Sequence, residues 1–275
     1  MLPPLYQTNL ENQLSQSQLL FFNLLINVLQ DIKEVSLEKI ANALPLPILF
    51  ESRRKKIQRF LSLPILKIQR IWFAIIENWL TQNLLENQRI YLVIDRTQWQ
   101  RNNLIMISLI YDRRALPVYW EILPKLGNSN FEEQTQIFFQ VLPLFKKYQT
   151  VVLGDREFCS IKLANWLREQ KVKFCLRLKK NEFIQNEKEI WQSLDSLDFS
   201  PGVSLFLQNI KVTKNQKIQG FNLAAKWRRV YKGWSPEEGW FILTNLSDLD
   251  SAIEALKNAL TSRKCFETLK VVGIT

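Results

Sequence analysis

The 275-residue sequence contains no histidine, and this absence excludes several classes of site. Catalytic Ser-His and Cys-His pairs and His-ligated metal centres all require an imidazole. The three cysteines, Cys159, Cys175 and Cys265, lack the paired spacing of a zinc site or a disulfide framework. Such sparse cysteine usage is typical of proteins in a reducing compartment.

Long apolar runs are also missing. The most apolar stretch, LLFFNLLINVL, is interrupted by two asparagines and is too short to span a bilayer. The N-terminal residues lack a basic segment followed by an apolar one, which is the pattern of a secretion signal. We therefore expect a cytoplasmic protein that does not insert into membranes.

Positive charge is in excess. There are 37 Lys and Arg residues against 26 Asp and Glu residues, which gives a formal net charge of +11. This balance favours a polyanionic partner, most simply nucleic acid, although an anionic membrane surface would attract the same charge. A hydrophobic fraction of 47% is ordinary for a globular protein, and the length suggests one large or two modest domains.

Residues 1–87 are predicted to form a helical, DNA-binding region, because apolar residues are dense and glycine is absent. Within it, IQRIWFAIIENWLTQ has apolar residues at helical spacing and is expected to be core. The preceding stretch ESRRKKIQRFLSLP holds a basic run that is either a solvated helix face or a set of phosphate contacts. The residues of this run are Arg53, Arg54, Lys55, Lys56 and Arg59.

From residue 88 to residue 182 the pattern changes to strands and helices in the order β-β-β-α-β-α-β. This order predicts an α/β fold with a mixed sheet flanked by helices. Residues 183–246 interrupt the alternation with an antiparallel hairpin, and residues 247–275 form the C-terminal part. Between Val203 and Trp234 there are seven basic residues and no acidic one, which favours a phosphate-facing surface. These residues are Lys211, Lys214, Lys217, Lys226, Arg228, Arg229 and Lys232.

Two carboxylates follow apolar strand segments, Asp95 in YLVID and Asp155 in VVLGD. A single aspartate in such a place is most often a turn or helix cap. Two of them on neighbouring strands would repel each other unless a cation lies between them or they share a proton. Since the chain offers no histidine, Mg²⁺ or Mn²⁺ held by oxygen ligands is the natural candidate. Two such ions can assist phosphoryl transfer.

Several motifs resemble those of bacterial insertion-sequence transposases of the DDE type. They are IDRTQW, LPVYWEILPKLGNSN, GDREF and FCLRLKKN, and they occur in the order found in that family. The resemblance implies a ribonuclease H-like core with a β insertion, and Mg²⁺-dependent cleavage and strand transfer at the ends of the element. It implies that Asp95 and Asp155 are the first two catalytic acids. It also implies that Arg177, Lys179 and Lys180 contact DNA, that at least a dimer assembles on DNA, and that the protein associates with the nucleoid. Trp99 and Trp120 are interpreted as core residues.

The third acid of the family signature is missing. The signature is Tyr, two residues, Arg, three residues, Glu, six residues and Lys on one helix, but this chain has Leu256, Ala259 and Arg263 in the first three positions. Only Lys270 matches, and it would face DNA. Arg263 would repel a cation. Glu157, which belongs to the GDREF motif, and Glu267, about one helical turn past the Glu position, are the nearest acids that could substitute.

A frameshift near Lys257-Asn258 would explain the mismatch. Permitted codons for ALTSRKCFETLKVVGIT, read one nucleotide out of register, can encode Arg, three residues, Glu, six residues and Lys, with the Glu at the position of Arg263. Either mutational decay or a programmed ribosomal slip would produce this pattern.

The sequence therefore leads to two main hypotheses. One is a DNA transposase, whose present chain is truncated and inactive for lack of the third carboxylate. The other is a catalytically dead DNA-binding fragment that inhibits full-length transposase. A non-specific nuclease on the same fold is a weaker alternative.

Overall fold

The computed structural model describes residues 2–99, 102–185, 190–197, 199–212, 218–227 and 239–258. The chain forms two compact units, and the boundary between them follows Leu85. The expectations for Lys214, Arg228, Arg229, Arg263 and Lys270, and for the frameshifted tail, lie outside the described residues.

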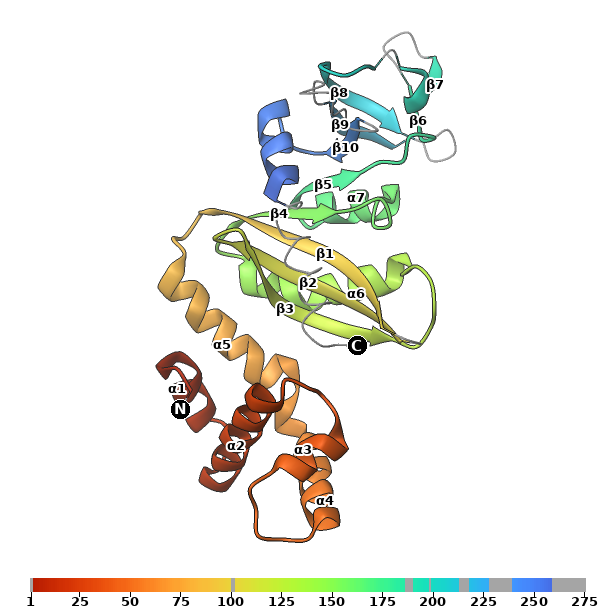
Figure 1. Cartoon of the computed structure of the whole chain (residues 1–275). Helices are drawn as coiled ribbons and strands as arrows, with labels where there is room; N and C mark the ends of the chain where they lie inside the picture. The colour runs from red at the N-terminus through yellow and green to blue at the C-terminus, as the bar shows by residue number, and fades with distance from the viewer. Residues whose placement is uncertain are drawn as a thin grey trace. The chain divides into compact units, whose positions relative to one another are not determined.

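The first unit, up to residue 85, is helical, as the sequence predicts (Figure 1). Serine side chains begin two of its helices, because Ser15 and Ser36 each accept a hydrogen bond from a backbone N–H of the first turn. The second, third and fourth helices share one apolar core, and the first and last contribute to another. The helices are α1 (Pro4–Glu11), α2 (Gln16–Ile32), α3 (Leu37–Ala43), α4 (Phe50–Leu61), the short 3-10 helix η1 (Pro64–Leu66) and α5 (Ile68–Asn83).

Helix α5 is the amphipathic segment expected from its apolar spacing. Ile75 and Ile76 are buried, whereas Trp72 and Trp79 are only half-buried. Trp72 stacks on Tyr6 of α1, with ring centroids 6.4 Å apart. The spacing therefore identified the buried side of the helix, while its tryptophans lie at the border of that side.

The second unit follows the predicted order of strands and helices, and the α/β fold class is confirmed. Its first strands form an antiparallel meander, and the next two run parallel to the first. The elements up to this point are β1 (Arg89–Trp99), β2 (Asn102–Tyr111), β3 (Arg114–Leu123), α6 (Phe131–Val141), η2 (Leu142–Phe145), β4 (Gln149–Gly154), α7 (Ile161–Glu169) and β5 (Lys173–Arg177).

Helix α6 packs on β2 and β3, and α7 packs on β5 (Figure 1). A capping box begins α6, since Asn130 and Glu133 exchange side-chain to backbone hydrogen bonds of 2.9 and 2.7 Å. The sequence predicts one helix over FEEQTQIFFQVLPLFKKY, but α6 ends at Val141 and a 3-10 turn follows. Pro143, which has no backbone N–H, lies in that turn.

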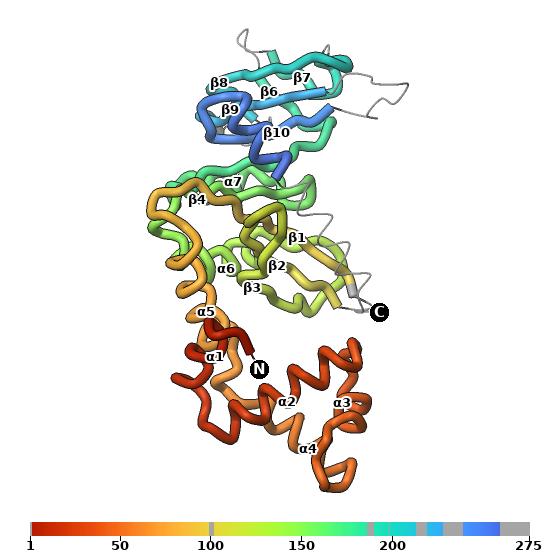
Figure 2. Tube along the Cα trace, turned by 60° about the vertical axis from the view of Figure 1, so that its left-hand side comes forward, coloured from red at the N-terminus to blue at the C-terminus, as the bar shows by residue number. Residues whose placement is uncertain are grey.

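The remaining strands continue the same sheet. The strand order is β3-β2-β1-β4-β5-β10-β9-β8-β6-β7, and Figure 2 shows β8, β9 and β10 side by side beyond β4 and α7. The expected hairpin is the antiparallel pair β8–β9, while the three-residue strands β6 and β7 were not predicted. These elements are β6 (Phe183–Gln185), β7 (Trp191–Ser193), η3 (Leu194–Ser196), β8 (Ser204–Val212), β9 (Ile218–Lys226) and β10 (Trp240–Thr244), followed by a helix from residue 249.

Candidate functional site

Asp95 and Asp155 lie at neighbouring positions of two parallel strands. The register of β1 and β4 pairs Ile94 with Gly154, so each aspartate comes one residue after this last pair. Adjacent strands are about 4.8 Å apart, so the two backbones present their carboxylates side by side. The sequence hypothesis of two neighbouring acids is therefore compatible with the fold.

The two carboxylates belong to one face of the sheet together with Arg177. A Cβ built on Gly154 would meet Ile94 Cγ2 at 3.5 Å and Leu176 Cδ2 at 2.8 Å, so these positions share a face. Side chains alternate along a strand, which places Asp95 and Arg177 on the opposite face. Arg177 Nη1 lies 3.8 Å from Asp155 Oδ1, which links Asp155 to the same group.

The backbone around each acid differs from the simple expectation of two strand ends. Asp155 does follow the last residue of β4, and a turn begins there, in which the N–H of Phe158 donates to the carbonyl of Asp155 at 2.9 Å. Asp95, in contrast, lies within β1, which continues in antiparallel pairing with β2 as far as Trp99. Only the parallel pairing ends before Asp95, because β4 stops at Gly154. Asp95 Oδ1 accepts the N–H of Arg96 at 2.8 Å.

An ion pair that the sequence reasoning missed connects the two motifs. Arg96 Nε donates to Glu157 Oε1 at 2.5 Å, and their side chains are only 17% and 20% exposed. Arg96 also donates to Asn103 and to Asn128. The signal in the sequence was the presence of Arg96, Asn128 and Glu157 in three of the quoted motifs, IDRTQW, LPKLGNSN and GDREF.

No group of three or more His, Cys, Asp or Glu side chains placed to hold a metal ion occurs among the described residues. Glu157, one of the two candidate substitutes for the third acid, is bonded to Arg96 and lies 3.5 Å from the backbone N–H of Ser129. Glu267, the other, lies outside the described ranges.

The helix expected to lead to the third acid is present from residue 249 to residue 258. Arg89 Nη1 lies 3.4 Å from Ser251 Oγ of this helix, and burial together with the carboxylate of Glu254 raises the pKa of Tyr91. Arg89, Tyr91 and Asp95 are an even number of residues apart on β1, so their side chains share one face of the strand. The helix therefore passes along the face that carries Asp95.

The predicted DNA-contacting residues of the second unit have different surroundings. Arg177 lies next to Asp155 with a side chain that is 16% exposed. Lys179 is exposed and lies two residues after β5, whereas Lys180 is half-buried. Lys211 and Lys226 are half-buried residues of β8 and β9.

The basic residues of α4 are also not equivalent. Arg53 is half-buried and donates to the carbonyl of Leu44 at 2.9 Å, which stabilises the C-terminal end of α3. Arg54 Nε lies 3.4 Å from Glu38, and Lys56 Nζ lies 5.1 Å from the centroid of the Phe21 ring. Lys56 is nevertheless exposed, as are Lys55 and Arg59. Counting charges in the sequence did not distinguish Arg53, whose side chain stabilises the fold, from the basic side chains that are exposed.

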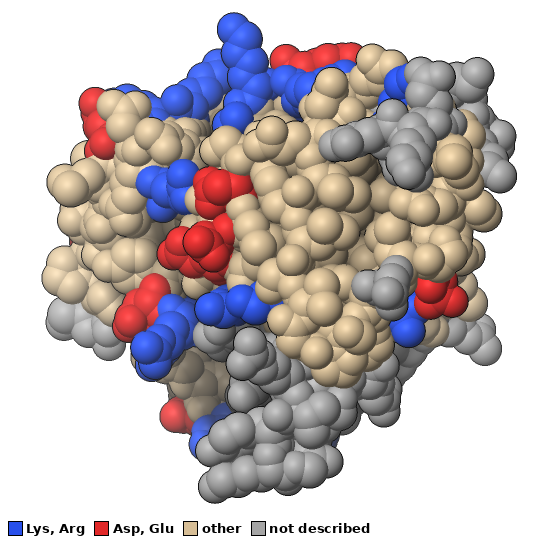
Figure 3. All heavy atoms as spheres, turned by 90° about the horizontal axis from the view of Figure 1, so that it is seen from above, with Lys and Arg blue, Asp and Glu red and all other residues tan. Residues whose placement is uncertain are grey.

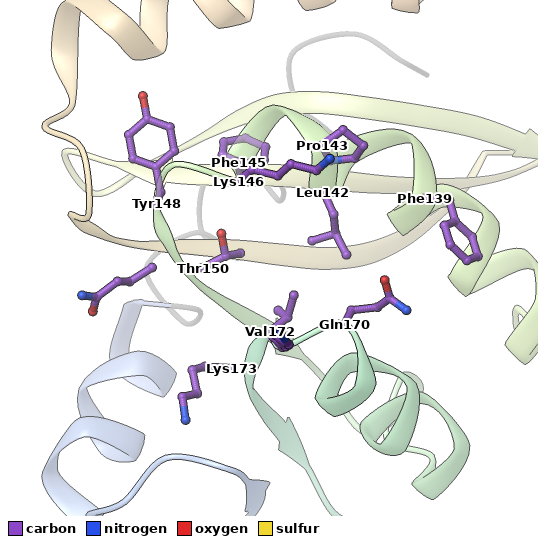
Figure 4. Close-up of a pocket in the computed structure, with 12 residues that line it drawn as sticks. Phe139, Leu142, Pro143, Phe145, Lys146, Tyr148, Thr150, Gln170, Val172 and Lys173 are labelled. Carbon is purple, nitrogen blue, oxygen red and sulfur yellow. The ribbon is translucent and has the colours of Figure 1, made fainter.

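A cavity of about 620 Å³ lies in the second unit, away from the aspartates. In Figure 4 the side chains of Leu142, Thr150 and Val172 point toward one another from η2, β4 and the segment before β5. These segments are the amino ends of β4 and β5, whereas Asp155 follows the carboxyl end of β4. This cavity therefore does not coincide with the aspartates, whose neighbouring positions follow from strand register.

Charge is unevenly spread over the surface. On the face drawn in Figure 3, Lys and Arg side chains gather along the upper margin near Asp and Glu side chains, and uncharged side chains cover most of the centre. The net charge of +11 thus does not make this face uniformly basic. None of the helices that the structure describes is both long and apolar enough to cross a membrane.

Comparison with known families identifies the domain that contains the two aspartates. A family model described as a transposase DDE domain matches residues 95–268, beginning at Asp95 itself. The chain belongs to this family. The resemblance to DDE transposases seen in the sequence motifs is thereby confirmed. DDE transposases in general use divalent metal ions.

Among solved structures, this DDE domain protein is similar to a chain of the piggyBac transposase synaptic complex with hairpin DNA. The two are 13% identical with a TM-score of 0.43, and the match covers 84% of this chain and 52% of that one. It is also similar to Marinitoga piezophila Argonaute in complex with 5′ OH guide RNA and target DNA, at 14% identity and a TM-score of 0.31, over 82% of this chain and 33% of that one. The chain therefore spans about half the length of the first of these and a third of the second. No curated protein matches the chain.

Proposed function

We propose that this chain carries the active site of a DNA transposase, which cleaves the ends of an insertion sequence and joins them to target DNA. The observation that supports this most is the place of Asp95 and Asp155, each one residue after the last pair of two adjacent parallel strands, in a chain of the DDE family. The proposal includes the domain limits 1–87, 88–182, 183–246 and 247–275, with DNA bound by the first and third.

Asp95 and Asp155 would hold Mg²⁺, or Mn²⁺ in its place. Two carboxylates that share a face repel each other, and hard oxygen ligands of this kind suit such an ion. When bound, the ion stabilises charge on the attacking and leaving oxygens of a phosphodiester. The N–H of Arg96 orients Asp95, and Arg177 offsets part of the negative charge at Asp155. Arg177 is also close enough to these acids to attract a substrate phosphate.

DNA would be bound chiefly through phosphate contacts. Lys55, Arg59 and Lys179 are exposed, and each is suited to this role. Joining two element ends requires two copies of the active site, so a dimer on DNA in the nucleoid is part of the proposal.

A second function is favoured by the residue in the third acid position. Arg263 stands where the family has glutamate, and it cannot bind a cation. The chain would then be an inactive DNA-binding protein that inhibits complete transposase. Sequencing the coding DNA tests the frameshift: an open shifted frame with Glu at position 263 supports it, and a closed frame refutes it.

The deciding experiment is a cleavage and strand-transfer assay with Mg²⁺ or Mn²⁺. It compares the chain as given with the frame-restored version, which carries glutamate at position 263. Activity in the restored version alone, abolished by Asp95→Ala or Asp155→Ala, would support a transposase site that is disabled in this chain. Activity in both would remove the inhibitor hypothesis, and restored activity that survives Asp155→Ala would refute the site.

A further inference from the structure

Arg96 joins three other segments at the carboxyl edge of the parallel strands. Its Nε donates to Glu157 in the turn after β4 at 2.5 Å. Its Nη1 donates to Asn103 of β2 at 3.1 Å, and its Nη2 donates to Asn128 in the loop after β3 at 3.4 Å. All three sides of the guanidinium are therefore engaged with different parts of the fold.

The network around Arg96 is well connected and largely buried, except at Asn128, which is exposed. Asn103 is fully buried, and its side-chain amide donates to the carbonyls of Lys125 and Gly127 at 2.6 and 2.8 Å. The loop after β3 is thereby tied to β2. An ion pair shielded from water, with its remaining hydrogen bonds satisfied, resists displacement more than an exposed one.

The position of this pair relative to the aspartates gives it a role. Arg96 follows Asp95 directly and points to the other face of β1, since side chains alternate. Glu157 is two residues after Asp155 in the turn that ends β4. The ion pair thus connects, from the opposite face, the two backbone segments that present the carboxylates. Two neighbouring carboxylates repel each other, and this repulsion acts to separate the segments that the ion pair holds together.

We infer that Arg96 and Glu157 are positioning residues, which hold Asp95 and Asp155 at a separation where both bind the same divalent ion. The inference rests on the proposed function and deepens it. Glu157 then acts through Arg96 and is not itself a ligand of the metal. Outer-shell partners of this kind typically change metal affinity by about 10–100-fold when they are removed.

The test is Mn²⁺ binding to the full chain, measured by the electron paramagnetic resonance signal of free Mn²⁺. Two conservative variants distinguish the roles of Glu157. Glu157→Gln keeps an oxygen that accepts from Arg96 at the same reach, and Glu157→Asp keeps the carboxylate but shortens it by one methylene. A positioning role predicts that the Gln variant binds Mn²⁺ more tightly than the Asp variant. A ligand role predicts the reverse order.

Three further variants complete the set. Arg96→Ala is expected to weaken Mn²⁺ binding by about tenfold or more. Lys125→Ala is the matched control, because it removes the Lys125–Glu133 ion pair of 2.8 Å in the neighbouring loop, which does not join the aspartates. It is expected to bind Mn²⁺ as the unchanged chain does. Asp155→Asn should abolish binding.

The outcomes separate the inference from the function it rests on. Two results would overturn the positioning role while leaving the metal site intact. One is tighter Mn²⁺ binding by Glu157→Asp than by Glu157→Gln. The other is Mn²⁺ binding by both Glu157 variants and by Arg96→Ala that equals that of the unchanged chain. Binding that is insensitive to Asp155→Asn, or that is absent from both the unchanged chain and the frame-restored version, would overturn the proposed site together with this inference. Should Arg96→Ala fail to fold, the order of the two Glu157 variants still decides.

Discussion

Replacing Gly154 with alanine should loosen the sheet at the position between the two aspartate-bearing strands. A Cβ at this residue would lie 2.8 Å from Leu176 Cδ2 and 3.1 Å from Phe158 Cβ. Real Cβ atoms essentially never approach another heavy atom as closely as the first of these. Leu176 Cδ2 is the end of a flexible side chain and can turn away, but Leu176 and Phe158 are both buried, so the side chains packed around them must move as well.

The size of the effect follows from two opposing contributions. Overpacking a filled core costs about 1–3 kcal/mol. Alanine in a strand is favoured over glycine by roughly 0.5–1 kcal/mol, because less backbone entropy is lost. The steric contribution is the larger, so Gly154→Ala should lower the free energy of unfolding by about 1 kcal/mol. It should also weaken Mn²⁺ binding, since the displaced residue directly precedes Asp155.

Amide hydrogen exchange of the full chain measures the local effect, because the N–H groups of β4 report its opening. Leu176→Val is the partner variant, since valine lacks the Cδ2 atom that is contacted. The double variant should be less destabilised than the sum of the single variants by about 0.5–3 kcal/mol. A Gly154→Ala chain with unchanged protection in β4, or with strictly additive effects, would refute the close packing described for this residue.

Three further predictions concern other parts of the chain. Lys55→Ala combined with Arg59→Ala should reduce the slope of log DNA affinity against log salt concentration by about two, as measured by filter binding. Arg53→Ala should leave that slope unchanged. It should instead lower the free energy of unfolding of the first unit by about 1 kcal/mol, as measured by urea unfolding. Gly127→Ala should cost roughly 1–2 kcal/mol in urea unfolding, because its φ of +87° is unfavourable for a side chain although no atom lies within 4 Å; an unaffected midpoint would contradict this. Burial raises the pKa of the Cys175 thiol to about 12 from 9.0, so the folded form keeps its proton where the unfolded form loses it. Stability should therefore fall as the pH rises from about 9 toward 12, and Cys175→Val should fall less.

The order of elements could be predicted because each has a local cause. β-rich apolar runs bounded by turn signals mark β1 to β5, and helical spacing marks α5 and α6. The short strands β6 and β7 could not be predicted, since three residues such as Phe183–Gln185 carry no period and depend on pairing with β8. The end of α6 could not be predicted either. The apolar pattern continues beyond Val141, but the helix ends there and a 3-10 turn that contains Pro143 follows.

The candidate site could be predicted in its composition but not in its connections. Asp95 and Asp155 were recognisable because each follows an apolar strand segment. The Arg96–Glu157 pair joins residues 61 positions apart, and only strand register reveals that they meet. The role of Arg53 was missed for a similar reason, because a hydrogen bond to a backbone carbonyl leaves no trace in a charge count.

The direct pairing of β10 with β5 has a practical consequence for anyone who shortens this protein. Residues 183–246 resemble a removable insertion in the sequence, yet β10 lies among them and satisfies the outer hydrogen-bonding edge of Lys173–Arg177. Deleting the whole stretch would leave that edge open, and open edges recruit strands from other molecules. A minimal fragment should therefore keep Trp240–Thr244 as a cover, or it will precipitate for reasons unrelated to its chemistry.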